Sequence, residues 1–179
     1  RRIAQEQALP TSINRSSRDI CFAQEGYRAL FAGSSVPPGD IVDVEGRKIG
    51  EHNGIFNYTI GQKKGLGTAR QMSGGGEPLY VLRIEPKENR IVVAPLNLLY
   101  KKEIQVEKIN YVGFEPPDKP LLVQTRIRYR QPDESATLIP VSEDGAIVIF
   151  DRPVFAPTAG QFAVFFCGRL LLGGGVIKG

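Results

Sequence analysis

The sequence has few of the residues that ligate metals or form disulfides. Its 179 residues include two cysteines, one histidine and no tryptophan. A zinc site would have almost no ligands to draw on, so we expect no metal site. Cys21 and Cys167 stand far apart in the chain and do not make a disulfide framework, which favours a reducing cytoplasm as the compartment.

Long apolar runs are also missing. No run approaches the length of a membrane span, and no charged-then-apolar signal segment begins the chain, so we expect no membrane partner. The composition, 41% hydrophobic and 23% charged, is that of a globular protein with one ordinary domain or two small ones. The net charge of +4 and the pI near 9.1 permit a nucleic-acid partner without requiring one.

Short segments rich in β-branched and aromatic residues recur along the chain, separated by turns of glycine, proline and asparagine. A hairpin is predicted where 41–44 and 47–50 flank Glu45-Gly46. Further strands are predicted over 55–60, 79–84, 90–94, 104–106, 121–130, 137–141, 146–150, 161–166 and 170–172. Short strands at this spacing are typical of a barrel or a sandwich.

The stretch 50–67, GEHNGIFNYTIGQKKGLG, contains the only histidine and a loop rich in glycine and lysine. Asn53-Gly54 tolerates a tight turn, so we interpret His52 as part of turn chemistry and not as a catalytic base. The loop 61–67 places Lys63 and Lys64 among three glycines, where backbone amides and ammonium groups can approach a phosphate. The alternative is a glycine-rich turn with two solvated lysines, and the loop does not match a Walker motif.

Cys21 follows a polar segment and lies between two apolar residues. The thiolate is the reactive form of cysteine, and Arg18 favours it whereas Asp19 opposes it. The alternative is a buried cysteine at the start of a strand or helix. Cys167 follows two phenylalanines at a predicted hairpin, and we interpret it as structural.

Three arginines alternate along the predicted strand 121–130. Arg126, Arg128 and Arg130 would share one face, where they need anionic partners or solvent. Phosphate would suit them, and Tyr129 beside them could stack on an exposed base. The alternative is a solvated face neutralised by the acidic pair at 133–134.

RDICF at 18–22, together with the stretch 50–67, resembles the tRNA-specific 2-thiouridylase family, whose members put sulfur on the wobble uridine of certain tRNAs. The family pattern around its second catalytic cysteine is similar to SxDICF, and its central domain carries GxHxG…TIGQRKGLG. The resemblance covers nearly the whole chain and extends to the closing LGGGVI. Lys63 stands where the family usually has arginine, which keeps the charge but loses the bidentate fork.

The resemblance implies roles for individual residues. Cys21 would carry the persulfide that delivers sulfur. RYRQ at 128–131 matches a motif whose Arg-Tyr pair, here Arg128 and Tyr129, contacts tRNA. The family's TPGQ turn, whose glutamine reaches tRNA, is TAGQ here and supplies Gln161. Lys63 and Lys64 are further candidates for phosphate contacts.

The resemblance also implies a mainly β fold, with a small central β domain followed by a C-terminal antiparallel β-barrel. We expect residues 1–28 to form a helical and loop segment carrying the cysteine, 29–96 the central domain and 97–179 the barrel. Family members begin with an ATP-pyrophosphatase domain that carries an SGGxDS loop and the first catalytic cysteine, and neither motif is in this sequence.

We therefore expect the C-terminal part of a tRNA-uridine 2-sulfurtransferase, inactive by itself, with ATP bound only by the missing domain and no cofactor bound by this chain. The expected partners are tRNA, that ATP-pyrophosphatase domain and a sulfur-donor persulfide protein. Two alternatives remain. One is a stand-alone RNA-binding β module with an incidental cysteine. The other is a barrel that docks protein partners, which the arginine pattern favours less.

Overall fold

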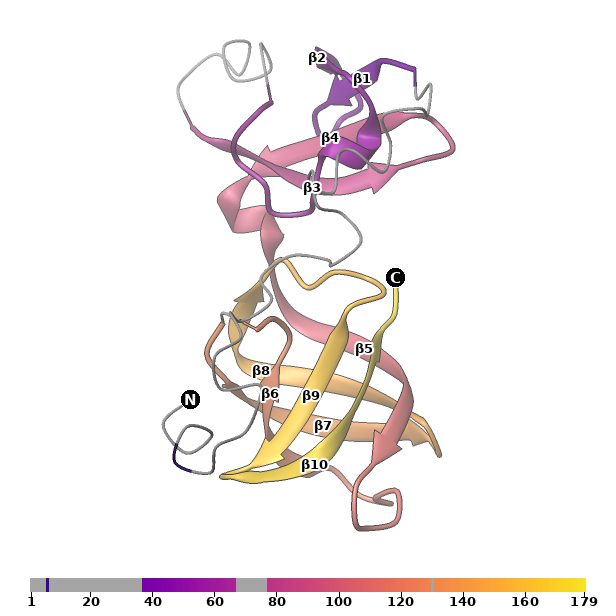
Figure 1. Cartoon of the computed structure of the whole chain (residues 1–179), viewed down its shortest axis with the longest axis vertical. Helices are drawn as coiled ribbons and strands as arrows, with labels where there is room; N and C mark the ends of the chain where they lie inside the picture. The colour runs from indigo at the N-terminus through magenta and orange to yellow at the C-terminus, as the bar shows by residue number, and fades with distance from the viewer. Residues whose placement is uncertain (1–5, 7–36, 67–76, 130) are drawn as a thin grey trace. The chain divides into compact units, whose positions relative to one another are not determined.

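The structure is a computed structural model that describes residues 6, 37–66, 77–129 and 131–179 (Figure 1). Cys21 and almost all of the segment 1–28, the stretch 67–76 and Arg130 lie outside the described residues. Pro37–Gly179 forms one compact unit. The expected domain boundaries at 28/29 and 96/97 stay predictions. Within the described ranges, no helix is long and apolar enough to cross a membrane.

Four strands form a mixed sheet in the order β2-β1-β4-β3 (Figure 1). β1 (Gly39–Val42) and β2 (Lys48–His52) make the predicted hairpin, and β3 (Leu79–Glu85) and β4 (Arg90–Pro95) make a second antiparallel pair. β1 and β4 run parallel to each other and join the two hairpins. This sheet is the small central β domain that the family resemblance implies.

The inner strand β4 is covered on both faces, which explains its unbroken apolar sequence. Ile91 and Val93 pack in one cluster with Ile41 and Val81, whereas Ala94 belongs to a second cluster on the other face. All four residues from Ile91 to Ala94 are buried. A strand buried on both faces reads as a continuous hydrophobic run and not as an alternation.

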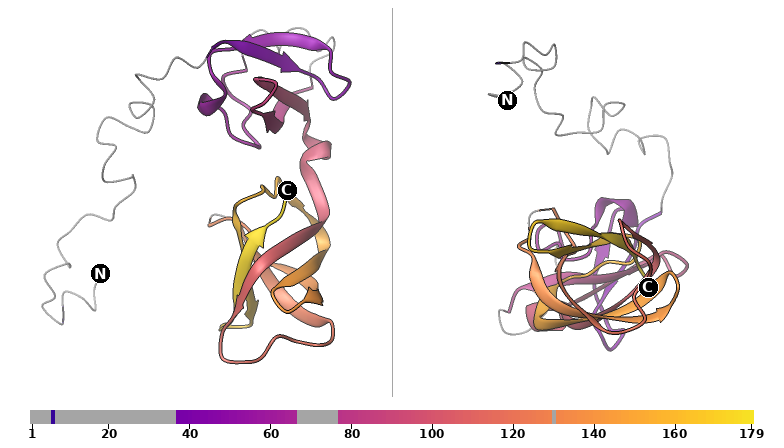
Figure 2. Two further views of the ribbon diagram at one scale, coloured as in Figure 1. Left: turned by 90° about the vertical axis from the view of Figure 1, so that its right-hand side faces the viewer. Right: turned by 90° about the horizontal axis from the view of Figure 1, so that it is seen from below.

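Six strands form a closed antiparallel barrel in the order β10-β5-β8-β7-β6-β9, which the right-hand view of Figure 2 shows end-on. The expected mainly β fold is confirmed, and the barrel replaces the sandwich alternative. The strands are β5 (Tyr100–Tyr111), β6 (Leu121–Arg126), β7 (Glu134–Ser142), β8 (Gly145–Phe155), β9 (Phe162–Cys167) and β10 (Leu170–Ile177).

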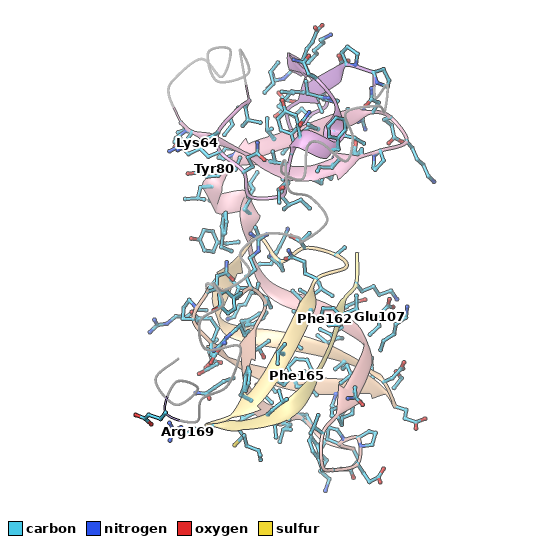
Figure 3. The ribbon with its side chains drawn as sticks, in the orientation of Figure 1. Lys64, Tyr80, Glu107, Phe162, Phe165 and Arg169 are labelled. Carbon is cyan, nitrogen blue, oxygen red and sulfur yellow. The ribbon has the colours of Figure 1, made fainter. Side chains whose placement is uncertain are left out.

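Alternate residues of the barrel strands fill its interior. Phe150 and Phe165 are the largest of the fully buried side chains (Figure 3 labels Phe165), and smaller aliphatic residues pack around them. The three consecutive glycines of β10 let it cross β5 closely. A Cβ on Gly175 would lie 2.7 Å from Val106 Cγ1, and one on Gly173 would lie 2.3 Å from the Asn110 carbonyl oxygen. The LGGG motif is therefore explained by strand packing.

Two strand predictions were wrong. The segment 55–60 is not a strand: a short 3-10 helix, η3 (Ile55–Asn57), begins after Gly54, whose φ is +98°. The Asn57 and Tyr58 amides donate to the carbonyls of Gly54 and Ile55, so local turn bonds replace a strand partner. The predicted strand 121–130 ends at Arg126.

Two features were not anticipated. A second 3-10 helix, η4 (Leu96–Leu99), connects β4 to β5, and β5 is far longer than the predicted 104–106. Leu99 is buried and its carbonyl accepts the Ala156 amide, so the connection is fixed against the end of β8. Because these contacts join residues far apart in sequence, no local pattern signals them.

Candidate nucleic-acid interface

The loop after η3 is held by its glutamine. Gln62 Oε1 accepts the Thr59 amide at 3.0 Å, and Gln62 Nε2 donates to the Lys64 carbonyl at 2.8 Å. The backbone also pairs with β3, since the Gly61 amide donates to Val81 O and the Val81 amide donates to Gln62 O. The TIGQ sequence therefore encodes a fixed turn on the sheet edge.

This turn exposes Lys63 and Lys64. Lys63 Nζ lies 5.8 Å from the centroid of the Tyr80 ring. Within the described ranges, neither ammonium group forms an ion pair with a carboxylate. Exposed lysines fit both the predicted phosphate contact and the alternative of a solvated turn, so the phosphate contact stays a prediction.

His52 has a structural role. Its side chain is 1% exposed, Nδ1 accepts the Gly54 amide at 3.1 Å, and Nε2 donates to the Asn89 carbonyl at 3.0 Å. Both nitrogens of the imidazole therefore bond to backbone groups. The predicted turn chemistry is confirmed, and the ring connects the end of β2 to the β3–β4 turn.

Arg128 does not lie on a strand face. Its Nη2 donates to the Ala156 carbonyl at 2.8 Å, to Thr158 Oγ1 at 3.0 Å and to the Ile60 carbonyl at 3.4 Å. The side chain is half-buried, with its guanidinium 6.0 Å from the centroid of the Phe155 ring. Burial lowers the pKa of Arg128 below its usual value.

Arg126 of the predicted stripe does not share a face with Arg128. Arg126 forms a two-bonded ion pair with Asp133, with Nε–Oδ1 and Nη2–Oδ2 distances of 2.5 and 2.9 Å. This hydrogen bond raises the pKa of Arg126 above its usual value. For Arg126 the alternative is therefore correct: Asp133, one of the two acidic residues at 133–134, neutralises its charge. Arg130 lies outside the described residues, and the expectation of three aligned guanidiniums was wrong because β6 ends too early.

Tyr129 is the most exposed large side chain of the described chain, at 92%. The turn that carries it is closed by the Gln131 amide, which donates to the Arg128 carbonyl at 3.1 Å. Gln131 Nε2 also donates to the Phe155 carbonyl at 3.2 Å. Arg128 and Gln131 thus fix the two ends of a turn whose tip presents an uncovered phenol ring.

The TAGQ turn follows β8. Gly160 has a φ of +82°, the Gln161 amide donates to Thr158 O at 3.1 Å, and the Gly160 amide donates to Ile177 O at 2.9 Å. Within the described residues, the buried Gln161 Oε1 has no hydrogen-bond partner. The turn therefore forms without the proline that is usual in the family, and its glutamine keeps an unused acceptor.

Arg128 connects three segments that are distant in sequence. Its donor Nη2 joins the RYRQ turn, the TIGQ loop through Ile60 and the TAGQ turn through Thr158. The sequence indicates each segment separately, but only the folded chain brings them to one guanidinium. Within the described part of the chain, no group of acidic, histidine and cysteine side chains could hold a metal ion.

Cys167 is exposed, which corrects the expectation of a packed structural cysteine. It ends β9 where Gly168 begins the turn to β10, and it borders a cavity of about 290 Å³ together with Leu122 and Phe166. At the end of the strand no further strand residue covers its thiol. Cys21 lies outside the described residues, so its role stays a prediction.

Two family models match the chain. A tRNA methyl transferase PRC-barrel domain matches residues 31–95, and an aminomethyltransferase beta-barrel domain matches residues 101–177. The first range contains the mixed sheet and the second contains almost all of the barrel. Together they define a two-module β protein of a kind found in tRNA-modifying enzymes.

Curated relatives identify the family. The chain is similar to the tRNA-specific 2-thiouridylase MnmA of Rippkaea orientalis, at 40% identity over 181 residues, and to that of Microcystis aeruginosa, at 38% over 182. These alignments cover 99% and 100% of this chain and 50% of each relative. The chain belongs to the tRNA-specific 2-thiouridylase family, and it spans about half the length of the curated relatives it matches.

Proposed function

We propose that this chain is the part of a tRNA-uridine 2-sulfurtransferase that docks tRNA and carries sulfur on Cys21. Activation of the uridine by ATP is then the task of an ATP-pyrophosphatase domain in the other half of the relatives' length. A persulfide-bearing protein would load Cys21, and the reaction would take place in the cytoplasm. By this division of labour the chain alone neither hydrolyses ATP nor thiolates tRNA.

The observation that carries the docking role is the convergence of three loops on Arg128. Two of the loops expose a group suited to RNA, since Tyr129 offers a stacking face and Lys63 an ammonium group. The third carries Gln161, whose amide oxygen is buried and has no hydrogen-bond partner within the described residues. Single-stranded RNA is recognised by this combination of stacking, amide and phosphate contacts. Lys64 adds a second charge to the same loop.

Arg128 contributes to this surface by holding the loops in place. Its Nη2 serves three acceptors, its Nε is buried, and its side chain is half-buried beside Phe155, so the guanidinium is held among the loops. A direct Arg128–RNA contact stays a prediction from the family resemblance. Both roles require Arg128 for binding, and they differ in how binding responds to salt.

The test is a titration of the chain with a substrate tRNA at several salt concentrations, combined with a sulfur-loading assay. We expect salt-sensitive tRNA binding that Tyr129→Ala weakens, and loading by a cysteine desulfurase that Cys21→Ser abolishes. Cys167→Ser is the matched control for loading. If the chain binds RNA but Cys21→Ser is loaded with sulfur as well as the wild type is, a stand-alone RNA-binding module is favoured instead.

A further inference from the structure

A cavity of about 540 Å³ lies where the sheet passes into β5. Two tyrosines line it, Tyr80 from β3 and Tyr100 from the start of β5, together with Leu96 and Asn97 of η4. Glu77, Pro78 and Pro95 complete its walls. The volume is within the usual range of small-ligand sites, roughly 300–1,000 Å³.

Two large side chains in the wall of this cavity are exposed to solvent. Tyr100 is 44% exposed and Leu96 is 40% exposed, although both belong to ordered elements. The Tyr100 ring is fixed against Phe155, with centroids 5.6 Å apart and planes tilted by 58°. An aromatic ring that is held on one side and open on the other is a stacking platform.

Charge beside the cavity indicates what it binds. Lys63 Nζ lies 5.8 Å from the centroid of the Tyr80 ring, and Lys64 follows it in the same exposed loop. The polar groups of the lining are the Asn97 amide and the Glu77 carboxylate. The site therefore offers an aromatic platform, an amide and a carboxylate for a polar edge, and ammonium groups for an anion.

We propose that this cavity binds one unpaired nucleotide of RNA. The base would stack on Tyr100, its polar edge would meet Asn97 or Glu77, and its phosphate would meet Lys63. A nucleotide uses all of these groups at once. An apolar anchor from a partner protein would contact only the tyrosines and Leu96, and it would make no use of the ammonium group of Lys63 beside the Tyr80 ring.

This inference rests on the proposed function, because it assigns part of the same RNA to a second place on the chain. The site shares Lys63 with the TIGQ loop but not the other two turns that meet at Arg128: no described residue of 128–131 or 158–161 lines the cavity. The sequence gives no signal for it, since Tyr80 and Tyr100 occur in ordinary strand patterns and only the η4 connection brings them together.

The experiment measures binding of the whole chain to a substrate tRNA and to a short single-stranded oligouridylate. Tyr100→Leu is expected to weaken binding of both by about 5- to 150-fold, the usual effect of losing one base–aromatic stack, with an unchanged salt slope. Tyr100→Phe keeps the ring and should bind like wild type. Lys63→Ala should reduce the log–log salt slope by roughly 0.7.

Phe114→Leu is the matched aromatic control, because Phe114 is 39% exposed in the segment after β5 and does not line the cavity. Lys119→Ala is the matched charge control. An oligouridylate carrying 5-iodouridine should cross-link to Tyr80 or Tyr100 on irradiation. Equal binding by Tyr100→Leu and Phe114→Leu, or cross-links found only elsewhere, would overturn the site.

Tyr129→Ala, measured in parallel, separates this inference from the proposed function. If Tyr129→Ala weakens tRNA binding and Tyr100→Leu does not, only the second site is refuted. If the chain binds neither RNA, or if every variant binds like wild type, the docking role fails as well.

Discussion

Thr158→Val tests whether Arg128 acts on RNA by holding the loops. The substitution replaces the hydroxyl with a methyl group of similar size and leaves Arg128 itself in place. Thr158 Oγ1 accepts from Arg128 Nη2 at 3.0 Å and donates to the Ala156 carbonyl at 3.0 Å. Both bonds are lost, while Nη2 keeps its 2.8 Å bond to the Ala156 carbonyl.

The size of the effect follows from these bonds. A hydrogen bond to a charged group contributes about 1.5–3 kcal/mol and a neutral one about 0.5–1.5 kcal/mol. Because Thr158 is only half-buried, water can replace part of the two lost hydrogen bonds. We therefore expect the free energy of unfolding to fall by about 2 kcal/mol. Looser docking of the TAGQ turn should weaken tRNA binding by roughly fivefold, about 1 kcal/mol.

The assays are urea unfolding and tRNA titration at several salt concentrations between about 50 and 200 mM. If Arg128 is a positioning residue, Thr158→Val and Arg128→Leu weaken binding without changing the log–log salt slope. A direct phosphate contact instead predicts a slope lower by roughly 0.7 for Arg128→Leu.

Arg152→Leu is the matched control, because Arg152 is an exposed arginine of β8 and belongs to none of the three loops. Arg152→Leu should leave the free energy of unfolding unchanged, and it should weaken tRNA binding only as much as the loss of one distant positive charge does. The reasoning is refuted if Arg128→Leu lowers the slope by one contact while Thr158→Val binds tRNA like wild type.

Three other substitutions give separate tests. Tyr129→Ala should cost about 1–3 kcal/mol of tRNA binding through lost stacking while leaving thermal stability unchanged, because the ring is exposed; Tyr129→Phe should bind nearly normally. Iodoacetamide should alkylate Cys167 readily in the native chain, because its thiol is exposed, and peptide mapping should show Cys21 reacting faster still if a lowered pKa prepares it for sulfur transfer. His52→Leu should lower the free energy of unfolding by about 2–4 kcal/mol in urea, since it leaves two backbone groups without the ring that bonds them; a loss below 0.5 kcal/mol would contradict the structural role.

Most of the strand pattern could be predicted from the sequence. The β1–β2 hairpin and the strand pair β3–β4 were anticipated because each joins neighbours in the chain, with turn residues between two apolar runs. The exposed lysines of the TIGQ loop were anticipated for the same reason. The spacing of the strands fits either a barrel or a sandwich, and the family motifs decided in favour of the barrel.

Local patterns failed where long-range contacts decide the conformation. Ile55, Phe56 and Tyr58 favour a strand by propensity, but the backbone after Gly54 makes local turn bonds, and η3 forms instead. Cys167 looked packed because of the phenylalanines before it, whereas its exposure depends on where β9 ends.

The sequence by itself determined the type of fold, the turn residues and the family. Hydrophobic periodicity and motif spacing depend on residues that are near one another in the chain, so they can be read from the sequence alone. Only the tertiary structure decided what the arginines do. Alternation placed Arg126 and Arg128 on one strand face, but closure of the barrel ends β6 at Arg126 and turns Arg128 toward carbonyls of other loops. Hydrogen-bond partners more than 25 residues away are set by the path of the whole chain, and no local pattern records them.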